Sequence, residues 1–418
     1  MTSTPDRTAQ DPWPPLSAGL SNTHPALRYC WHPVARLADV ADRPLRVLLL
    51  GEPWVLARLG PAGEVRAFAD RCPHRQAPLS IGSVVMRPAW AATAPPEPAL
   101  RCAYHGWCFG VDGRCVDIPA LGVSTPAPGA PALAPGAPAS ATASTAHIPP
   151  RATLRAAHRV AERHGMVFVC PTAPPPGLDD EAAATFDALQ ALPDIDEAGD
   201  PSFMPGDLPV MRANASAGLL ADNFLDMAHF PFVHAATFGA EDPVVPAMHV
   251  ERDATDPSRR WSFTATSEHP FSNREDPGVA QGIRALVQRR RVTYRVHAPF
   301  HLVLRLDFLD SGGSNVIGFF LQPETEDRCR IFSTIWRDDL GHDPGRMASA
   351  VDFEVKVIEE DLGIQEAYDV RALPLDPTVE VHTRADRTTL ELRRMLSDVV
   401  AAVHAATVPA RQPPGGAT

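Results

Sequence analysis

The sequence predicts an α+β protein, in which an all-β domain at residues 25–172 precedes a domain of mixed strands and helices at residues 173–408. Short apolar runs separated by turn residues dominate the first part, as is typical of small β domains. The second part combines alternating apolar patterns with longer segments of helical periodicity. The length of 418 residues also suits two or three domains, at roughly 150 residues per domain.

In the first domain, residues 46–50, 54–58 and 65–68 are apolar runs separated by turns that contain Gly and Pro. We expect each run to form a strand, and residues 166–169 to form the last strand of the domain. Two inserts rich in Pro and Ala, at residues 86–99 and 124–150, interrupt the domain. Because neither insert can bury much apolar surface, both should be surface loops.

The second domain follows a Pro-rich linker at residues 171–177. Apolar residues at helical spacing predict helices at residues 215–230, 347–368 and 388–406. Strands are expected at residues 302–308, 316–321 and 329–336, with a polar turn between the last two. Polar composition predicts disorder in residues 1–24 and in a tail at residues 409–418.

The formal charge of −12, from 38 basic and 50 acidic side chains, argues against a nucleic-acid partner, because phosphates would be repelled. No apolar run approaches the roughly 18 residues that span a bilayer. The first residues lack the apolar core of a signal peptide, so a cytoplasmic location is expected. There, the seven cysteines suit metal binding or core packing better than disulfides.

Four potential metal ligands occur in two similar segments, Cys72-Pro-His74 and Cys102-Ala-Tyr-His105. Two thiolates and two imidazoles can bind one zinc ion. They can also bind a Rieske [2Fe–2S] cluster, in which two cysteines hold one iron and two histidines hold the other. Zinc fingers usually group the cysteines together and the histidines together, whereas here each segment supplies one of each. This arrangement favours the cluster over zinc or a chance proximity of buried side chains.

The residues around these ligands, at 71–79 (RCPHRQAPL) and 100–109 (LRCAYHGWCF), resemble the Rieske oxygenase family. The resemblance covers about residues 26–370 and implies an all-β Rieske domain followed by a catalytic domain with a curved antiparallel sheet and helices (helix-grip, START-like). The 27 residues between His74 and Cys102 exceed the family's usual spacing, which fits the insert at residues 86–99. Ala77 and Tyr104 stand where respiratory Rieske proteins carry a disulfide clamp, so the resemblance is to the oxygenase type. Trp107 should shield the cluster from water.

A second group of polar residues lies in the segment 223–234 (NFLDMAHFPFVH). Asp226 and His229 are three residues apart, which places them on one face of the expected helix. Pro231 disfavours the helical conformation at Phe230, so a kink there can turn His234 back towards His229. Two histidines and one carboxylate form the facial triad of non-haem Fe(II) oxygenases. The alternative is two histidines that are merely satisfied at the end of an apolar helix.

The acidic segment 359–366 (EEDLGIQE) can supply the carboxylate, although acidic runs are usually solvated helix faces. The resemblance implies that Asp361 is the iron ligand, with Glu359 and Glu360 as alternatives. It also implies that Asp226 connects His229 to the cluster ligand His105 of a neighbouring chain within a homotrimer, as a carboxylate that orients both imidazoles. Asn223, one turn before Asp226, is expected near the open iron position.

The resemblance implies an oxygenase component that uses O₂ and Fe(II). Electrons should come from a separate NAD(P)H-dependent reductase, with or without a ferredoxin, because the chain lacks a G-x-G-x-x-G motif in a βαβ setting. The expected substrate is an organic compound, aromatic or cyclic, that is hydroxylated or demethylated, as in the single-subunit monooxygenases. The alternatives are the large subunit of a cis-dihydroxylating dioxygenase and a non-catalytic Rieske electron carrier.

Overall fold

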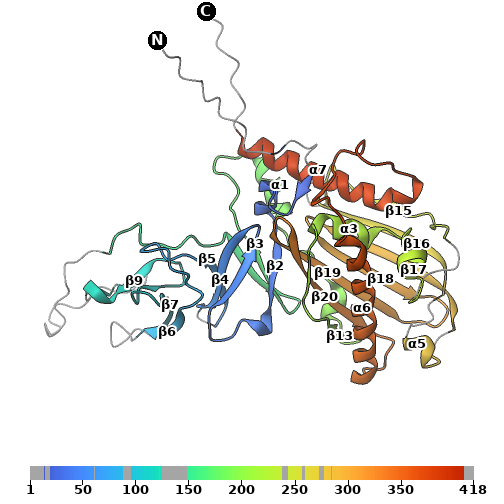
Figure 1. Ribbon diagram of the computed structural model, residues 1–418, viewed down its shortest axis with the longest axis horizontal. Coiled ribbons are helices and arrows are strands. Elements are labelled where there is room, and N and C mark those ends of the chain that lie inside the picture. The colour runs from blue at the N-terminus through green and yellow to red at the C-terminus, as the bar shows by residue number, and fades with distance from the viewer. Residues whose placement is uncertain are drawn as a thin grey trace, which may run out of the picture. The chain divides into compact units, whose positions relative to one another are not determined.

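The computed structural model divides the chain into two compact units (Figure 1). We call residues 31–173 the β unit, and residues 1–30 together with 174–418 the α+β unit. The structure describes residues 14, 19–60, 62–87, 96–121, 123–124, 148–237, 243–256, 259–272, 277–283 and 285–408. The insert expected at residues 124–150 lies largely outside these ranges, and the tail expected at residues 409–418 lies entirely outside them.

The described part of the β unit contains three antiparallel sheets. The first consists of β3 (Leu45–Leu49), β4 (Glu52–Arg58) and β5 (Val65–Ala69), and the second of β11 (Arg159–Arg163), β12 (Met166–Cys170) and β2 (His32–Arg36), in that order. The third has the order β10 (Val123–Ser124), β9 (Cys115–Ile118), β8 (Cys108–Phe109), β7 (Glu97–Arg101) and β6 (Ser83–Arg87). Two short 3-10 helices, η3 (Leu37–Asp39) and η4 (Pro119–Leu121), complete the unit.

The expected strands of this unit correspond to β3, β4, β5 and β12, each within two residues at either end. The insert expected as a loop at residues 86–99 is shorter than that, because its ends belong to β6 and β7. These two strands pair from Ser83 with Arg101 to Arg87 with Glu97. The insertion therefore lengthens the connection of one hairpin and leaves the pairing before the second ligand segment intact.

The α+β unit is built on one antiparallel sheet of eight strands. Its strand order is β13 (Met204–Asp207), β20 (Arg328–Arg337), β19 (Ser314–Thr325), β18 (His301–Phe308), β17 (Val287–His297), β16 (Ser262–Ser272) and β15 (His249–Glu251), and β14 (Met211–Ala213) also pairs with β20. The helices are α1 (Asp180–Leu189), α2 (Asp196–Gly199), α3 (Ala217–Leu225), α4 (Phe230–Val233), α5 (Pro277–Ala280), α6 (Pro344–Gln365) and α7 (Arg387–Thr407), with η2 (Pro25–Tyr29) and η5 (Arg384–Asp386) as 3-10 helices.

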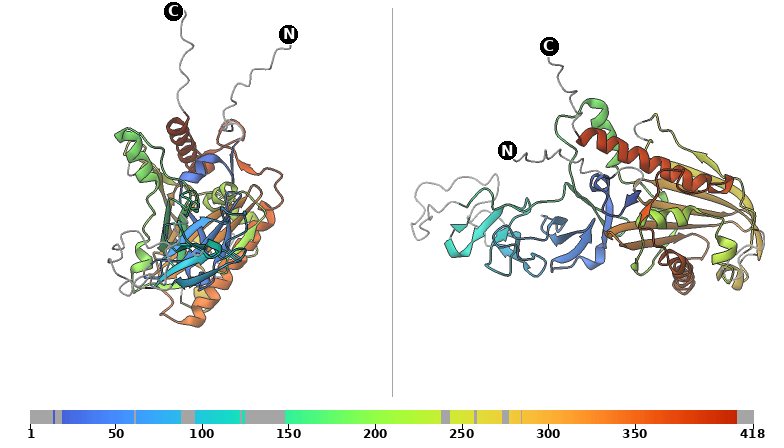
Figure 2. Two further views of the ribbon diagram at one scale, coloured as in Figure 1. Left: turned by 90° about the vertical axis from the view of Figure 1, so that its left-hand side faces the viewer. Right: turned by 45° about the horizontal axis from the view of Figure 1, so that its top comes forward.

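Helices α3 and α6 lie on one face of this sheet, and the cavity described below lies between them and the strands (Figure 1). Figure 2 shows α7 passing beside β15 and β16, with which it packs. The predicted strands and long helices of this unit are all present, and α6 and α7 begin and end within three residues of the expected positions. No helix among the described residues is long and apolar enough to cross a membrane.

Two expectations about this unit need correction. Residues 20–24, expected to be disordered with the rest of residues 1–24, are ordered, because β1 (Leu20–Ser21) pairs with β21 (Ala372–Leu373). The helix expected at residues 215–230 ends at Leu225. A separate short helix, α4, then begins at Phe230, where Pro231 occupies the first turn and therefore costs no helical hydrogen bond. Asp226 and His229 consequently lie in the turn between two helices.

Candidate functional site: two similar cysteine–histidine loops and a three-ligand centre

The two ligand segments of the β unit adopt the same loop conformation. In the first, the backbone N–H of Cys72 donates to the carbonyl of Ala77, and the N–H of Gln76 donates to the carbonyl of Cys72. The second repeats both bonds, from Cys102 to Trp107 and from Gly106 to Cys102. The residue four positions after each cysteine has a positive φ, +61° at Gln76 and +73° at Gly106. Two equivalent loops therefore present their ligands as a matched pair.

The cysteines of these loops are buried, and the histidines lie nearer the surface. Cys72 and Cys102 are each 2% exposed and belong to the core of the unit, whereas His105 is exposed. The rings of His74 and His105 are 4.5 Å apart between centroids. Trp107 stacks on His74 at a centroid distance of 4.5 Å and an interplanar angle of 7°, and so covers one side of the His74 imidazole.

The donor set fits a [2Fe–2S] cluster better than it fits an unmetallated core. Burial is the main reason why the pKa of the Cys72 thiol rises to about 11, and the neighbouring Cys102 raises it further. A thiol with this pKa becomes a thiolate near neutral pH only when a metal binds it. The Nδ1 atom of His74 is buried and has no hydrogen-bond partner among the described residues. An iron ligated through that nitrogen satisfies it.

The second site is in the α+β unit, where α4 and α6 bring three ligand atoms together. His229 is the residue before the first turn of α4, His234 follows its last turn, and Asp361 lies on α6. Nε2 of His229 is 3.2 Å from Nε2 of His234 and 3.3 Å from Oδ1 of Asp361. Nε2 of His234 is 3.2 Å from the same carboxylate oxygen. The three atoms thus form a nearly equilateral triangle.

This triangle has the dimensions of one face of a metal coordination sphere. An ion that binds three atoms at about 2.1 Å, with bonds at right angles, separates those atoms by about 3.0 Å. Without a metal, the three groups compensate one another electrostatically. Burial lowers the pKa of His229, but Asp226 and Asp361 outweigh this effect and raise it to about 9. The two histidines hold the pKa of Asp361 below its usual value although burial opposes them. A divalent cation replaces the proton in such a site.

Glu360, expected as an alternative ligand, contacts a ligand instead of joining the triangle. Its Oε2 accepts hydrogen bonds of 2.8 Å from Nδ1 of His234 and from the Thr237 hydroxyl. The bond places the proton of a neutral His234 on Nδ1, so Nε2 is the nitrogen that can bind a metal. Glu359, the other alternative, is exposed on the outer side of α6. Sequence reasoning missed Thr237, although its position three residues after His234 was a usable signal.

Asp226 and Asn223 lie next to the triangle. Oδ2 of Asp226 is 3.5 Å from Nδ1 of His229, and its Oδ1 accepts from the backbone N–H of Ala228 at 2.7 Å. The Asp226 side chain is 31% exposed, so it reaches from His229 to the surface of the unit. Asn223 donates through Nδ2 to Oδ1 of Asp361 at 3.3 Å, as expected for a neighbour of the metal position.

A cavity lined mainly by aromatic and aliphatic side chains opens beside the triangle. It lies between α3, α6 and strands β16 to β20, and Asn223, His229, His234 and Asp361 form one end of it. The sequence did not reveal which strand residues face inward, because the register of the sheet decides this. An apolar cavity that ends at a metal-binding triangle can hold an organic molecule against the metal.

Comparisons with known proteins match both parts of the chain. The family model described as "Rieske [2Fe-2S] domain" matches residues 30–128. The model described as "Vanillate O-demethylase oxygenase C-terminal domain" matches residues 213–402. A curated relative, the probable methylxanthine N7-demethylase NdmC of a Pseudomonas species, is 32% identical over 208 residues, which is 47% of this chain and 68% of the relative. Methylxanthine N3-demethylase NdmB of Pseudomonas putida is 27% identical over 383 residues, 88% of each chain.

Solved structures show the same fold. That of NdmB from Pseudomonas putida aligns with a TM-score of 0.68 at 24% identity, covering 94% of this chain and 98% of that one. Dicamba monooxygenase bound to dicamba aligns with a TM-score of 0.66 at 21% identity, covering 91% and 99%. The chain belongs to the Rieske non-haem iron oxygenases, a family of oxidoreductases. It is an oxygenase component with a Rieske cluster and a non-haem iron, and it oxidises an organic substrate with O₂.

Proposed function

We propose that this oxygenase removes a methyl group bonded to nitrogen or oxygen of a small ring compound by oxidising it. The observation that carries the proposal is the apolar cavity that ends at His229, His234 and Asp361. Two relatives of similar length are named N-demethylases, which supports this reaction over dihydroxylation. One O₂, two electrons and two protons convert the methyl group to a hydroxymethyl group and one water. The bond from nitrogen or oxygen to that carbon then breaks, formaldehyde leaves, and the hydroxyl proton passes to the nitrogen or oxygen.

In this proposal Cys72, His74, Cys102 and His105 hold the cluster, and His229, His234 and Asp361 hold the Fe(II). Iron supplies the site where O₂ is reduced beside the substrate. The chain's own residues do the rest of the work. Glu360 orients His234, Asp226 orients His229, and the aromatic cavity wall excludes water from the reacting methyl group.

We propose further that the working form is a homotrimer, in which Asp226 receives electrons through His105 of a neighbouring copy. Both groups are accessible, since Asp226 is 31% exposed and His105 is exposed. An exposed aromatic side chain accompanies each of them: Phe232 near Asp226 is 73% exposed, and Tyr104 beside His105 is 64% exposed. Apolar side chains of this kind suit burial in an interface. The cytoplasmic location also stays a prediction.

The test uses the chain loaded with cluster and Fe(II), a surrogate reductase and NADH. We expect formaldehyde from a panel of N-methyl and O-methyl ring compounds, in step with O₂ consumption. A His229→Ala/His234→Ala variant should keep the visible spectrum of the cluster, contain about two iron atoms per chain in place of about three, and release no formaldehyde. Continued formaldehyde release by that variant would show that the metal site has been misassigned.

A further inference from the structure

The cavity has a polar end opposite the metal triangle. Asn315, Arg290 and Glu354 line it, and their exposed fractions are 4%, 6% and 8%. Burying three such groups in an otherwise apolar cavity costs free energy unless they are used or paired. The cost of burying these groups therefore suggests that they pair with one another or bind a polar group of a ligand.

The polar end lies about one small molecule away from the metal triangle. Glu354 precedes Asp361 by seven residues on α6, which corresponds to about 10 Å along the helix axis. On the sheet, Asn315 precedes Phe319 by four residues, or about 13 Å. Phe319 marks the metal end, because it stacks on Phe224 of α3 at a centroid distance of 4.6 Å.

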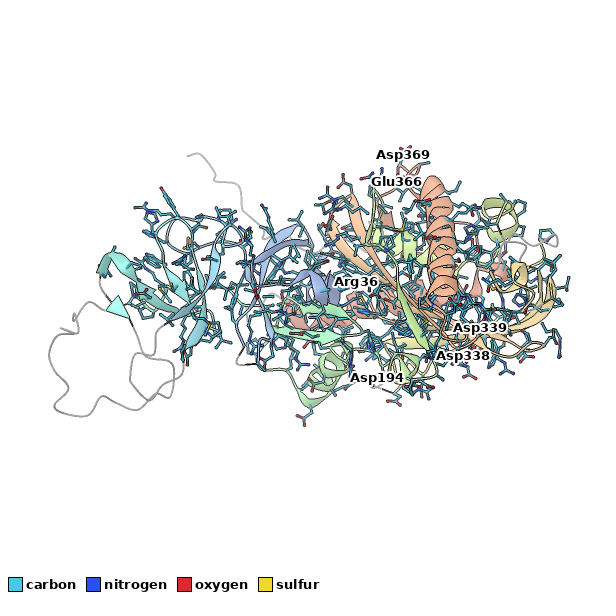
Figure 3. The ribbon with its side chains drawn as sticks, turned by 90° about the horizontal axis from the view of Figure 1, so that it is seen from below. Arg36, Asp194, Asp338, Asp339, Glu366 and Asp369 are labelled. Atoms are coloured by element: carbon cyan, nitrogen blue, oxygen red, sulfur yellow. The ribbon has the colours of Figure 1, made fainter. Side chains whose placement is uncertain are left out.

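Figure 3 locates the two ends on α6. Asp339 lies near one end of the helix, and Glu366 and Asp369 lie near the other. Asp339 accepts two hydrogen bonds of 2.8 Å from Arg337, which is the cross-strand neighbour of Asn315. The helix and the sheet thus give similar separations, about 10 Å and about 13 Å.

The side-chain amide of Asn315 donates one hydrogen bond through Nδ2, while its Oδ1 accepts none among the described residues. Its Nδ2 donates to Oε1 of Glu354 at 3.2 Å. Reversing the amide would turn two oxygens towards each other, so the hydrogen bond fixes which way Oδ1 points. Oδ1 is buried and has no hydrogen-bond partner among the described residues. A buried acceptor in this state favours a ligand that brings a donor.

Charge at the polar end is balanced. Arg337 forms its ion pair with Asp339, and both side chains are 4% exposed. The remaining buried charges that line this end are one guanidinium, Arg290, and one carboxylate, Glu354. A site with equal numbers of positive and negative groups gains little from a net charge on the ligand. It suits a neutral hydrogen-bonding group.

From these observations we infer that Asn315 is a specificity-determining residue, which accepts a hydrogen bond from an N–H or O–H group of a neutral ring substrate, at the end opposite the methyl group that is oxidised. The inference rests on the proposed function, because it takes the metal triangle as the place of oxidation. It adds the substrate class: an apolar ring with a neutral donor about one ring length from the reacting methyl group.

The test compares matched pairs of probes in which a methyl group replaces the donor hydrogen: 4-methoxyphenol with 1,4-dimethoxybenzene, and theobromine with caffeine. Dissociation constants are measured by calorimetry on the iron-loaded chain, without reductase. We expect the wild-type chain to bind the donor-bearing member of at least one pair about tenfold more tightly. Asn315→Leu should bind both members equally. Ile317→Leu, a volume-conserving change two residues along the same face of β19, should keep the preference.

Asn315→Leu removes a hydrogen bond to the buried Glu354, which can impair folding, so the double variant Asn315→Leu/Glu354→Met removes both groups together. It too should show no preference between the members of a pair. A preference that survives in either variant overturns the inference. So does a wild-type chain that prefers neither donor-bearing probe, whether because it binds both members equally or because it binds none. A wild-type chain that binds the donor-bearing probe more tightly but releases no formaldehyde from it counts instead against the proposed function.

Discussion

His234 shows how one residue beside a ligand prepares a metal site. Its ring is 1% exposed, so every polar contact that it makes is with the protein or with a metal. Glu360 accepts from Nδ1 at 2.8 Å and is itself held by the Thr237 hydroxyl at the same distance. The imidazole is therefore oriented before iron arrives, and iron binding loses less side-chain entropy.

Replacing Glu360 should weaken iron binding without disturbing the cluster. We expect Glu360→Ala to lower the Fe(II) affinity of the mononuclear site about 10- to 100-fold, because the hydrogen bond from Nδ1 that orients His234 is lost. Glu360→Gln should restore most of the affinity, since its amide oxygen can accept the same hydrogen bond. The measurement is competition with an Fe(II) chelator, with the visible spectrum of the cluster as the internal reference.

Glu359→Gln is the matched control, because Glu359 is the exposed neighbour on the same helix. It should leave iron affinity unchanged. Equal affinities in Glu360→Ala and the wild type would show that His234 needs no such partner.

The sequence alone could not separate Asp361 from Glu360. Both are acidic, adjacent and on the same predicted helix, and successive helical residues point about 100° apart. Only the packing of α6 against α4 decides that Asp361 lies beside Nε2 of both histidines, while Glu360 accepts from Nδ1 of His234. The four cluster ligands were easier to predict, because two short loops supply them and local spacing alone defines the pattern.

Among the elements, the break between α3 and α4 has the largest effect on the site. A continuous helix through residues 215–230 would hold Asp226 and His229 rigidly on one face. Instead α3 ends at Leu225 and α4 starts at Phe230, so four residues of turn carry the ligand and its neighbour. Apolar periodicity continues through this turn, which is why the sequence pattern did not reveal the break.

The start of η2 makes the α+β unit sensitive to acid. The Nδ1 atom of His24 accepts a hydrogen bond of 3.2 Å from the backbone N–H of Ala26, so this nitrogen must be unprotonated. Burial lowers the pKa of His24 from 6.5 to about 4. Because the unfolded chain binds the proton first, the stability that this residue contributes is complete above pH 6.5 and is lost as the pH falls towards 4.

We expect protonation of His24 to lower the free energy of unfolding by roughly 2 kcal/mol between pH 6.5 and pH 4. His24→Asn keeps a capping acceptor that does not titrate, so its stability should fall less steeply between pH 6.5 and 4. His269 and His297, whose pKa values burial also lowers to about 4, should preserve part of the slope. Urea unfolding at a series of pH values measures the difference, and identical slopes for the two chains would contradict it.

At the scale of the whole molecule, the homotrimer can be tested by dividing the two metal sites between chains. A Cys102→Ser chain should lack the cluster, and a His229→Ala/His234→Ala chain should lack the mononuclear iron. Neither should release formaldehyde alone. In assemblies formed by co-expression of equal amounts, about one interface in four joins a working cluster to a working iron site of the next chain.

We therefore expect the mixed assemblies to recover about a quarter of the wild-type activity. Light scattering on the same samples should give a mass near three times the 45.0 kDa of one chain. If electrons instead pass within a chain, the mixed assemblies should be inactive, because each chain lacks either the cluster or the mononuclear iron. Mixed assemblies without activity, at the trimer mass, would rule out transfer between chains.

Exposure of His105 also has a consequence for oxygen chemistry outside the catalytic cavity. On a single chain, the histidine side of the cluster is open to solvent, and Tyr104 beside it is 64% exposed. A reduced cluster in that state can pass electrons directly to dissolved O₂ and waste reducing equivalents as peroxide. In the proposed trimer, contact with a neighbouring copy would shield the cluster from O₂ as well as complete the route to iron. Diluting the enzyme until it dissociates should therefore raise the peroxide formed per NADH while formaldehyde falls.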